Sequence, residues 1–298
     1  KPHPVYGRMG PATFDQVAST KLSIRINLKK PEGIALAKRL VAISDVAAES
    51  FRAGVMARLG LGFEALKQVK RDIVMLSVSS CGQEGPDSHF AGYAPLFGAW
   101  GGLSDLTGFA DGPPVEMRHV MDHTVGMNAA VATMAALHRR RATGEGAWVD
   151  VAAREVASSL IGEALLVAAA GGEVSRAGNS HPRMSPHGVY PAKEEDHWLS
   201  IAISTDGERQ ALAKLIGGEP TDEAISAWTR TRDGNAAAEE LQAAGIAAHA
   251  SWTTPEIAAD PHLQARGAIV EVAEPDGKKR AAVGVPMRLS KGPEIGIH

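Results

Sequence analysis

The stretch Ile73-Val74-Met75-Leu76-Ser77-Val78 decides the fold class of this chain. It is an apolar run of strand length without polar alternation, which is typical of a strand buried on both faces. Strands of that kind occur in parallel sheets whose two faces are covered by helices. The run therefore favours an α/β protein over an antiparallel or all-helical one.

The sequence before this run supplies the other parts of an α/β unit. Residues 22–28 alternate between apolar and polar side chains and predict a half-buried strand. Pro31 opens a helix, residues 45–49 predict a short strand, and two short helical segments follow at 55–59 and 63–69. Strands and helices that alternate at this spacing predict a parallel sheet.

The sequence after the run becomes rich in glycine and then helical. We expect helix within 95–106, and a second, apolar helix from 149 to 170. Between them a long helix starts near Asp122. One of its faces carries four apolar side chains at helical spacing, Met127, Val131, Met134 and Leu137. The helix therefore has one apolar face.

The sequence pattern changes near Ser175, where the apolar helical segments end and a polar segment begins. Residues 175–191 predict a polar loop, 198–203 and 247–252 strands, and 255–266 a helix. Further helices are expected at 208–216, 222–230 and 236–244, and a hairpin at 268–272 and 281–285 around Asp276-Gly277. This half of the chain is expected to form a smaller α+β domain.

Composition excludes several classes of protein. The 298 residues, 44% of them hydrophobic, are enough for a large core, and the net charge of −3 suits neither nucleic acid nor an anionic membrane surface. Cys81 is the single cysteine, so no internal disulfide forms, which fits a cytoplasmic protein. No apolar run reaches the roughly 18 residues of a membrane span. No cluster of His, Cys and carboxylate has metal-ligand spacing, so no metal is expected.

Asp122 has two interpretations when the residues are taken alone. Aspartate is among the best N-cap residues, and a cap at the start of the long helix is the simpler one. A carboxylate in that place is also a possible nucleophile, because a helix N-terminus keeps it ionised. The two roles are compatible, and the choice between them determines what the protein does.

Several phrases, in order along nearly the whole chain, resemble the class III CoA-transferases, the CaiB/BaiF family. They are Lys21-Leu22-Ser23-Ile24, Leu28-Lys29-Lys30-Pro31-Glu32-Gly33, Glu49-Ser50-Phe51-Arg52-Ala53-Gly54, Arg58-Leu59-Gly60-Leu61-Gly62-Phe63-Glu64, Gly82-Gln83-Glu84-Gly85-Pro86, Asp122-His123-Thr124-Val125-Gly126, Thr143-Gly144-Glu145-Gly146, Asp260-Pro261-His262-Leu263-Gln264-Ala265-Arg266-Gly267 and Gly284-Val285-Pro286-Met287-Arg288-Leu289. Each phrase is weak by itself, and their shared order makes the resemblance specific.

The resemblance implies a fold and an assembly. We expect a large Rossmann-like domain from residues 1–175, to which 273–298 returns, and a small α+β domain from 176–272. Family members form interlocked dimers, so an intertwined homodimer or a heteromer with a related subunit is expected. The chain begins Lys1-Pro2-His3-Pro4, and the family's usual N-terminal strand and turn, which carry CoA contacts and a glutamine, are missing here. We therefore expect this sequence to be the interior of a longer polypeptide.

The resemblance also implies an activity. A family member of this kind (EC 2.8.3 type) moves CoA between an acyl-CoA donor, such as succinyl-CoA, and a carboxylic acid, and coenzyme A enters only as this substrate. Asp122 matches the family nucleophile, which forms an acyl anhydride and then an aspartyl-CoA thioester. Covalent catalysis of this type divides the exchange into easier steps.

Four residues match the positions that contact CoA in the family. They are Lys21, Phe51, Arg52 and Arg58. A guanidinium suits a phosphate, so Arg58 is expected to pair with one, although a solvated helix arginine is nearly as good an interpretation. Backbone N–H groups of four glycines, Gly85, Gly101, Gly102 and Gly126, are candidate donors to the oxyanion, with tight turns as the simpler alternative.

Tyr93 separates two activities of the family fold. Racemase relatives carry a basic histidine at about this position, and a phenol is no base near neutral pH. CoA transfer therefore stands ahead of an α-methylacyl-CoA racemase, and a non-catalytic subunit of a heteromeric CoA-transferase is a further alternative. Tyr93 and Arg183 are the expected contacts to the substrate acid, and His181 or His187 are the alternatives to Arg183 for meeting the acceptor carboxylate.

Overall fold

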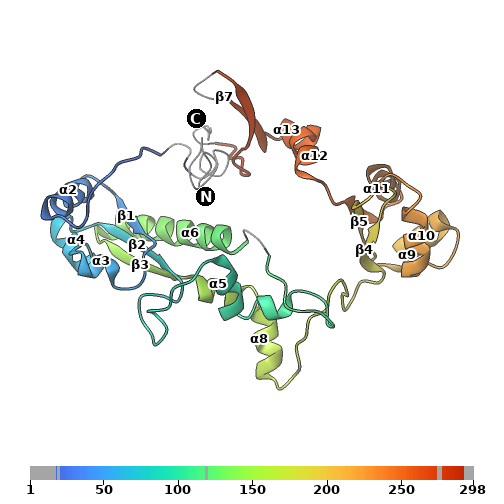
Figure 1. Cartoon of the computed structure of the whole chain (residues 1–298), viewed down its shortest axis with the longest axis horizontal. Helices are drawn as coiled ribbons and strands as arrows, with labels where there is room; N and C mark the ends of the chain where they lie inside the picture. The colour runs from blue at the N-terminus through green and yellow to red at the C-terminus, as the bar shows by residue number, and fades with distance from the viewer. Residues whose placement is uncertain (1–17, 19–20, 118–119, 274–276, 292–298) are drawn as a thin grey trace. The chain divides into compact units, whose positions relative to one another are not determined.

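The computed structural model describes residues 18, 21–117, 120–273 and 277–291 (Figure 1). The chain divides into two compact units, Arg25–Asn179 and a second unit made of Lys1–Ile24 and Ser180–His298. The predicted mixed α/β fold with a parallel sheet is confirmed by the first unit. The predicted domain bounds stay a prediction, and part of the returning segment 273–298 lies outside the described residues, as does the start of the chain at Lys1-Pro2-His3-Pro4.

The first unit is built on three parallel strands. They are β1 (Val46–Glu49), β2 (Val74–Ser79) and β3 (Ala147–Ala152), in the order β1-β2-β3. The pairing aligns Val74 of β2 with Val46 of β1 and with Ala147 of β3. The apolar run predicted to be a buried strand is therefore the central strand, and Val74 and Met75 are fully buried.

Short helices connect β1 to β2. Helix α2 (Pro31–Ala42) precedes β1, and α3 (Val55–Arg58) and α4 (Phe63–Val69) follow it. Proline suits the first turn of α2 because its missing N–H has no helical acceptor there. Helices α2 and α4 contact each other around a buried cluster of Val41, Leu61, Leu66, Ile73 and Met75.

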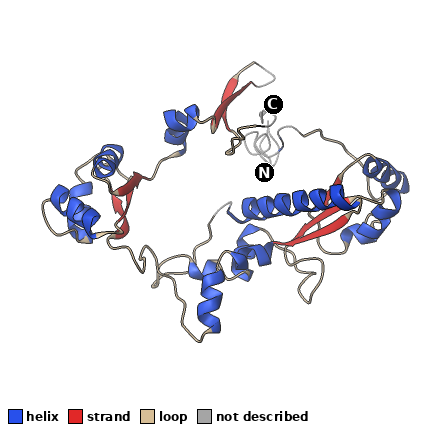
Figure 2. Ribbon diagram, turned by 180° about the vertical axis from the view of Figure 1, so that it is seen from behind, coloured by secondary structure: helices blue, strands red, loops and turns tan. Residues whose placement is uncertain are grey.

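The long helix α6 (Val120–Thr143) connects β2 to β3 and packs on both strands (Figures 1 and 2). Its contacts to the core come from Met121, Val125 and Ala129. Helix α5 (Ala94–Trp100) and the 3-10 turn η1 (Ser104–Leu106) precede it, and α7 (Ala153–Ser159) follows β3. A Cβ at Gly101 would collide with Ala157, so this glycine lets the end of α5 approach α7.

The apolar face that helical spacing identifies on this helix is not the face that packs on the core. The buried side chains follow the register of Val125, whereas Met127, Val131 and Met134 are 62%, 70% and 65% exposed. Helical spacing identifies a stripe of apolar residues, but it does not identify the surface that packs against the stripe. In a single chain this stripe faces solvent.

Two further predictions from the sequence need correction. Residues 22–28 form no strand, and Leu22 is fully exposed, because no described strand pairs with this alternating segment. The helix predicted at 149–170 instead begins as β3, whose alternating valines pair with β2. Helix then resumes as α7 and, after a break, as α8 (Gly162–Ala169).

The second unit contains an antiparallel sheet covered by helices. Strands β4 (His187–Pro191), β5 (Trp198–Ala202) and β6 (Ala247–Ala250) pair in that order. Helices α9 (Asp206–Ile216), α10 (Asp222–Thr229) and α11 (Gly234–Ala243) begin at side-chain caps from Thr205, Thr221 and Asp233. Strand β4 lies inside the predicted polar loop and escaped prediction. Its Tyr190 is buried and donates a hydrogen bond of 2.7 Å to Asp222.

The last described elements are two short helices and a hairpin. Helix α12 (Thr254–Ala259) and helix α13 (Pro261–Ala265) replace the single helix predicted at 255–266. Asp260 has an extended backbone, and its side chain caps α13, so the chain turns before Pro261. Strands β7 (Ile269–Ala273) and β8 (Lys279–Val283) form the predicted hairpin, and Asp276 of its predicted turn lies outside the described residues.

Candidate active site

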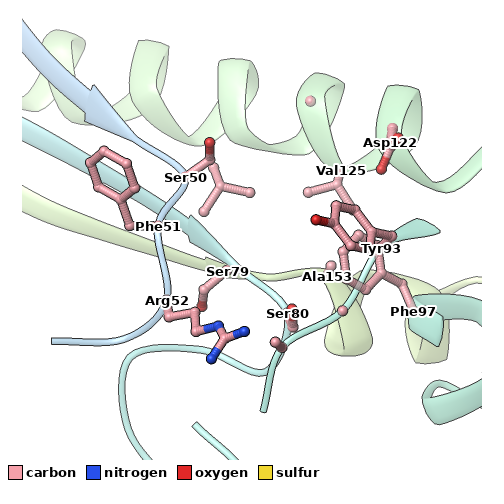
Figure 3. Close-up of a pocket in the computed structure, with 14 residues that line it drawn as sticks. Ser50, Phe51, Arg52, Ser79, Ser80, Tyr93, Phe97, Asp122, Val125 and Ala153 are labelled. Atoms are coloured by element: carbon pink, nitrogen blue, oxygen red, sulfur yellow. The ribbon is translucent and has the colours of Figure 1, made fainter. Parts of the chain in front are cut away.

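A cavity of about 480 Å³ lies where the three parallel strands end (Figure 3). Ser50 follows β1, Ser79 ends β2, and Ala153 follows β3, and all three residues line the cavity. The carboxyl ends of parallel strands meet at one edge of a sheet, and ligands of open α/β sheets bind outside that edge. The position of the cavity thus follows from the topology of the sheet.

Asp122 reaches this cavity from α6. It is the third residue of the helix, so it lies within the first turn and is not the N-cap. Figure 3 shows Asp122 and Val125 extending from α6 at the cavity. Val125 is buried and anchors this turn, whereas Asp122 is exposed. The unpaired N–H groups of the first turn favour a negative charge there.

The loop after β1 brings Phe51 and Arg52 to the same cavity. Glu49 accepts a hydrogen bond from the Phe51 backbone at 2.7 Å, and Gly54 donates its backbone N–H to the side chain of Gln83 at 3.2 Å. Gly54 has a φ of 75°, a conformation that favours glycine. These contacts fix the path of the loop, and the Phe51 ring and the Arg52 guanidinium remain exposed.

The loop after β2 is fastened to the end of β3. Asp150 accepts a hydrogen bond from the Gln83 backbone at 2.8 Å, and Arg154 donates its backbone N–H to Ser80 at 2.9 Å. Arg154 also forms an ion pair with Asp87 at 2.7 Å, and this hydrogen bond raises the pKa of Arg154. The wall of the cavity is therefore tied together across two strands.

Tyr93 completes the group that the structure brings together. It is the residue before α5, it lines the cavity with Phe97, and its side chain is 84% exposed. Asp122, Phe51, Arg52 and Tyr93, four of the residues proposed from sequence, thus share one cavity (Figure 3). Their roles in it stay predictions.

The cavity combines a carboxylate at a helix N-terminus, a guanidinium and aromatic rings. The family model for CoA-transferase family III matches residues 2–296. The chain belongs to CoA-transferase family III. The resemblance to the CaiB/BaiF proteins predicted from the sequence is confirmed, and the protein is a family III CoA-transferase, whose substrates are CoA thioesters.

Relatives of this family III CoA-transferase include two proteins whose substrates are in their names. Succinyl-CoA–D-citramalate CoA-transferase of Chloroflexus aurantiacus is 32% identical over 315 residues, covering 95% of this chain and 77% of that protein. Succinate–glutarate CoA-transferase of Agrobacterium fabrum is 31% identical, covering 92% and 73%. Among solved structures, a CAIB/BAIF family protein from Brucella suis is 27% identical and superposes with a TM-score of 0.83, covering 96% of this chain and 79% of that one.

Three residues proposed for this family III site are not among the residues that line the cavity. Arg58 is exposed on α3 and does not line it. Lys21 and Arg183 belong to the other compact unit, so the structure does not place them relative to Asp122. The Arg183 backbone N–H donates to the ring of His181 at 3.2 Å. The roles of all three residues remain predictions.

Two of the four glycines considered as oxyanion donors already use their N–H groups in hydrogen bonds within the chain. Gly101 and Gly102 donate their N–H groups to backbone carbonyls of α5, at 2.9 and 3.3 Å. Gly126 lies inside α6, and Gly85 does not line the cavity. For Gly101 and Gly102 the hydrogen bonds therefore favour the simpler alternative of tight turns.

Ser79 lines the cavity, and the sequence analysis did not identify it as a candidate site residue. Its side chain is 8% exposed, and its hydroxyl has no hydrogen-bond partner among the described residues. A buried unpaired hydroxyl is costly and needs a reason. Its position at the end of a buried parallel strand was the available signal, because such ends carry ligand sites.

Two negative observations apply to the described part of the chain. Within it, no three His, Cys, Asp or Glu side chains are grouped so that they could hold a metal ion. No helix there has both the length and the apolar character needed to cross a membrane.

Proposed function

We propose that this protein transfers CoA from an acyl-CoA, with succinyl-CoA as the donor, to a carboxylic acid through covalent intermediates on Asp122. The observation that carries the proposal is the exposed carboxylate of Asp122, in the first turn of α6, lining a cavity at the carboxyl ends of the sheet. The names of the relatives support succinyl-CoA and a dicarboxylic acid as the pair of substrates.

The proposed reaction is balanced without water or a redox partner. A carboxylate oxygen of Asp122 attacks the thioester carbon, the C–S bond breaks, and CoA thiolate leaves an acyl-aspartyl anhydride. The thiolate then attacks the aspartyl carbonyl and releases the donor acid, which leaves an aspartyl-CoA thioester. The acceptor carboxylate attacks that thioester, the C–S bond breaks, and the CoA thiolate leaves an anhydride between Asp122 and the acceptor. The thiolate then attacks the acceptor's acyl carbon, so the product acyl-CoA forms and the Asp122 carboxylate leaves as it began.

The other cavity residues support the same chemistry. Arg52 offers charge-assisted hydrogen bonds to an anionic part of the substrate. Phe51, Tyr93 and Phe97 supply apolar surface that limits water around the anhydride. Tyr93 is a phenol, so a base for proton abstraction next to the thioester carbonyl is absent from this position, which favours transfer over racemisation.

The proposal includes the assembly expected from the family. It takes the first unit as part of a Rossmann-like domain and two chains as an interlocked dimer, either of identical or of related subunits. The exposed apolar stripe Met127, Val131 and Met134 on α6 supports this, because such surface in a single chain is normally covered by another one. A cytoplasmic location belongs to the same proposal.

The chemistry is tested by trapping the covalent intermediate. The protein is incubated with succinyl-CoA, treated with hydroxylamine and digested, and mass spectrometry locates the modified peptide. We expect the modification on Asp122, and we expect Asp122→Ala to lose CoA transfer by on the order of 10³-fold or more.

Asp111→Ala is the matched control, because Asp111 is exposed and does not line the cavity. It should retain both the modification and the activity. Transfer that persists in Asp122→Ala, or modification at another residue, would remove the proposed nucleophile.

A further inference from the structure

Gly126 lies one helical turn after Asp122 and lines the same cavity. Residues four apart lie on one face of a helix, one above the other. The Cα–Cβ bond of a helical residue tilts toward the N-terminus, so a side chain at position 126 would lean toward Asp122. The size of residue 126 therefore sets the free space beside the carboxylate.

Glycine at this position has no structural explanation among the described residues. Inside a helix it is less stable than alanine, because it loses more backbone freedom on folding. Its φ is not among the positive values seen at other glycines of this chain. A Cβ at Gly126 would have no neighbouring atom within 4 Å, whereas a Cβ at Gly101 would collide with Ala157. Close packing thus explains Gly101 and does not explain Gly126.

The open space in front of Gly126 is the cavity itself. Val125, the preceding residue, is buried against the core, so α6 is packed against the protein at this turn. Asp122 and Gly126 both line the cavity from consecutive turns of α6, and the first carries a carboxylate whereas the second has no side chain.

We propose that Gly126 determines which acyl groups reach Asp122, by leaving room beside the carboxylate for the acyl chain of the thioester. This inference rests on the proposed function and adds a specificity position to it. Acyl groups that are longer or branched next to the thioester carbon need the space of a missing side chain. Small acyl groups need it less.

The test compares Gly126→Ala and Gly126→Val with the unchanged protein. Rates of Asp122 modification are measured in single turnovers with acetyl-CoA, succinyl-CoA and isobutyryl-CoA, trapped with hydroxylamine. We expect losses of about 10- to 100-fold for succinyl-CoA and isobutyryl-CoA, larger for valine than for alanine, and a much smaller loss for acetyl-CoA. The affinity for free CoA, which has no acyl group, should change by less than about twofold on the same reasoning.

Three controls keep the outcomes distinct. Ala130→Val adds bulk one turn further along α6, at an exposed residue outside the cavity lining, and should leave all three rates unchanged. Gly126→Ala should melt at the same or a higher temperature than the unchanged protein, because alanine is the better helix former. The mass of each variant in solution should equal that of the unchanged protein.

Equal losses for all three acyl-CoAs, unchanged rates, or a change in oligomeric mass would overturn the role of Gly126. If the unchanged protein forms no adduct on Asp122, the proposed function falls, and this inference falls with it. If the adduct forms and the Gly126 variants do not discriminate by acyl size, only this inference falls.

Discussion

The proposed reactivity of Asp122 comes from its position in the first turn of α6, where its carboxylate faces the cavity. Aspartate is common at the start of helices, and a residue of this type in the first turn of α6 requires no function by itself. What distinguishes Asp122 is that Val125 holds its turn against the core while its carboxylate stays open to a cavity with Arg52 and Ser79. The same side chain on a helix facing bulk solvent would only stabilise the helix.

Arg52 and Arg58 match the same family stretch, but only Arg52 lines the cavity. We predict that Arg52→Ala raises the KM for succinyl-CoA by about tenfold or more, because a charge-assisted hydrogen bond contributes roughly 1.5–3 kcal/mol. The KM for the acceptor acid and kcat should change little. Steady-state kinetics with each substrate varied in turn measure this.

Arg71→Ala is the control for Arg52, because Arg71 is exposed just before β2, at the opposite end of the strand from the cavity. It should leave both KM values unchanged. A fall in kcat alone in Arg52→Ala would show that the arginine acts on the chemical step and not on binding.

At the scale of elements, α6 has two different ends. Its first turn carries Asp122, and its last turns are fixed to the amino end of the sheet. Arg140 donates a hydrogen bond of 2.7 Å to Asp45, just before β1, and lies 3.7 Å from Asp72, just before β2. The hydrogen bond and charge of Arg140, with a smaller effect of Lys70, lower the pKa of Asp45. Helix α6 thus extends from the cavity at the carboxyl ends of the strands to the ion pairs at their amino ends.

This anchor predicts a pH dependence. Because the pKa of Asp45 is lowered in the folded protein, the ion pair stabilises the fold above the pKa that Asp45 has in the unfolded chain. That contribution disappears as the pH falls through the lower, folded value. We predict that Arg140→Met lowers the melting temperature at pH 7 and that the difference from the unchanged protein shrinks in acid.

Arg139→Met provides the comparison for Arg140. Arg139 pairs with Glu145 at 2.7 Å on the open surface, where ion pairs contribute little. Its effect at pH 7 should be smaller than that of Arg140→Met. A difference for Arg140→Met that stays constant from pH 7 to pH 3 would show that Asp45 is not the group that responds.

At the scale of the whole molecule, the single chain leaves much apolar surface uncovered. Besides the stripe on α6, helix α8 exposes a group of large apolar side chains, Leu165, Leu166 and Val167. Monomeric proteins seldom expose apolar residues in such groups. Both helices belong to the first unit, so this unit carries the surface expected to meet another subunit.

We predict that Val131→Glu, at the centre of the stripe on α6, weakens the proposed dimer. A charge in an apolar interface must be desolvated without a partner, which makes association unfavourable. Light scattering after size exclusion should show the mass of the unchanged protein to be that of two subunits and a shift toward one subunit in the variant.

Arg39→Glu, on the exposed side of α2, changes charge elsewhere on the same unit and should leave the mass unchanged. Two results would contradict an interface at this stripe. One is a monomeric unchanged protein, and the other is a variant that keeps its full mass.

The order of elements in the first unit was largely determined by local sequence. The apolar run of β2, the proline that opens α2 and the short segments at α3 and α4 are recognisable because period and turn residues act within a few residues. Local sequence did not predict the secondary structure of segments whose conformation depends on whether a neighbouring strand pairs with them. The alternating segment 22–28 finds no described strand to pair with, whereas Trp148 to Val151 became a strand because β2 offers it an edge.

The sequence by itself determined the family and the α/β class and pointed to Asp122 as the proposed nucleophile, because ordered phrases and strand patterns are readable without coordinates. Only the tertiary structure decided which proposed residues meet, since Phe51 and Arg52, Tyr93, and Asp122 come from three segments that converge at the carboxyl ends of parallel strands. It also showed that the stripe Met127, Val131 and Met134 is exposed and does not pack on the core. The physical reason is that the sequence period identifies an apolar face of a helix, whereas the burial of that face depends on which element the fold packs against it.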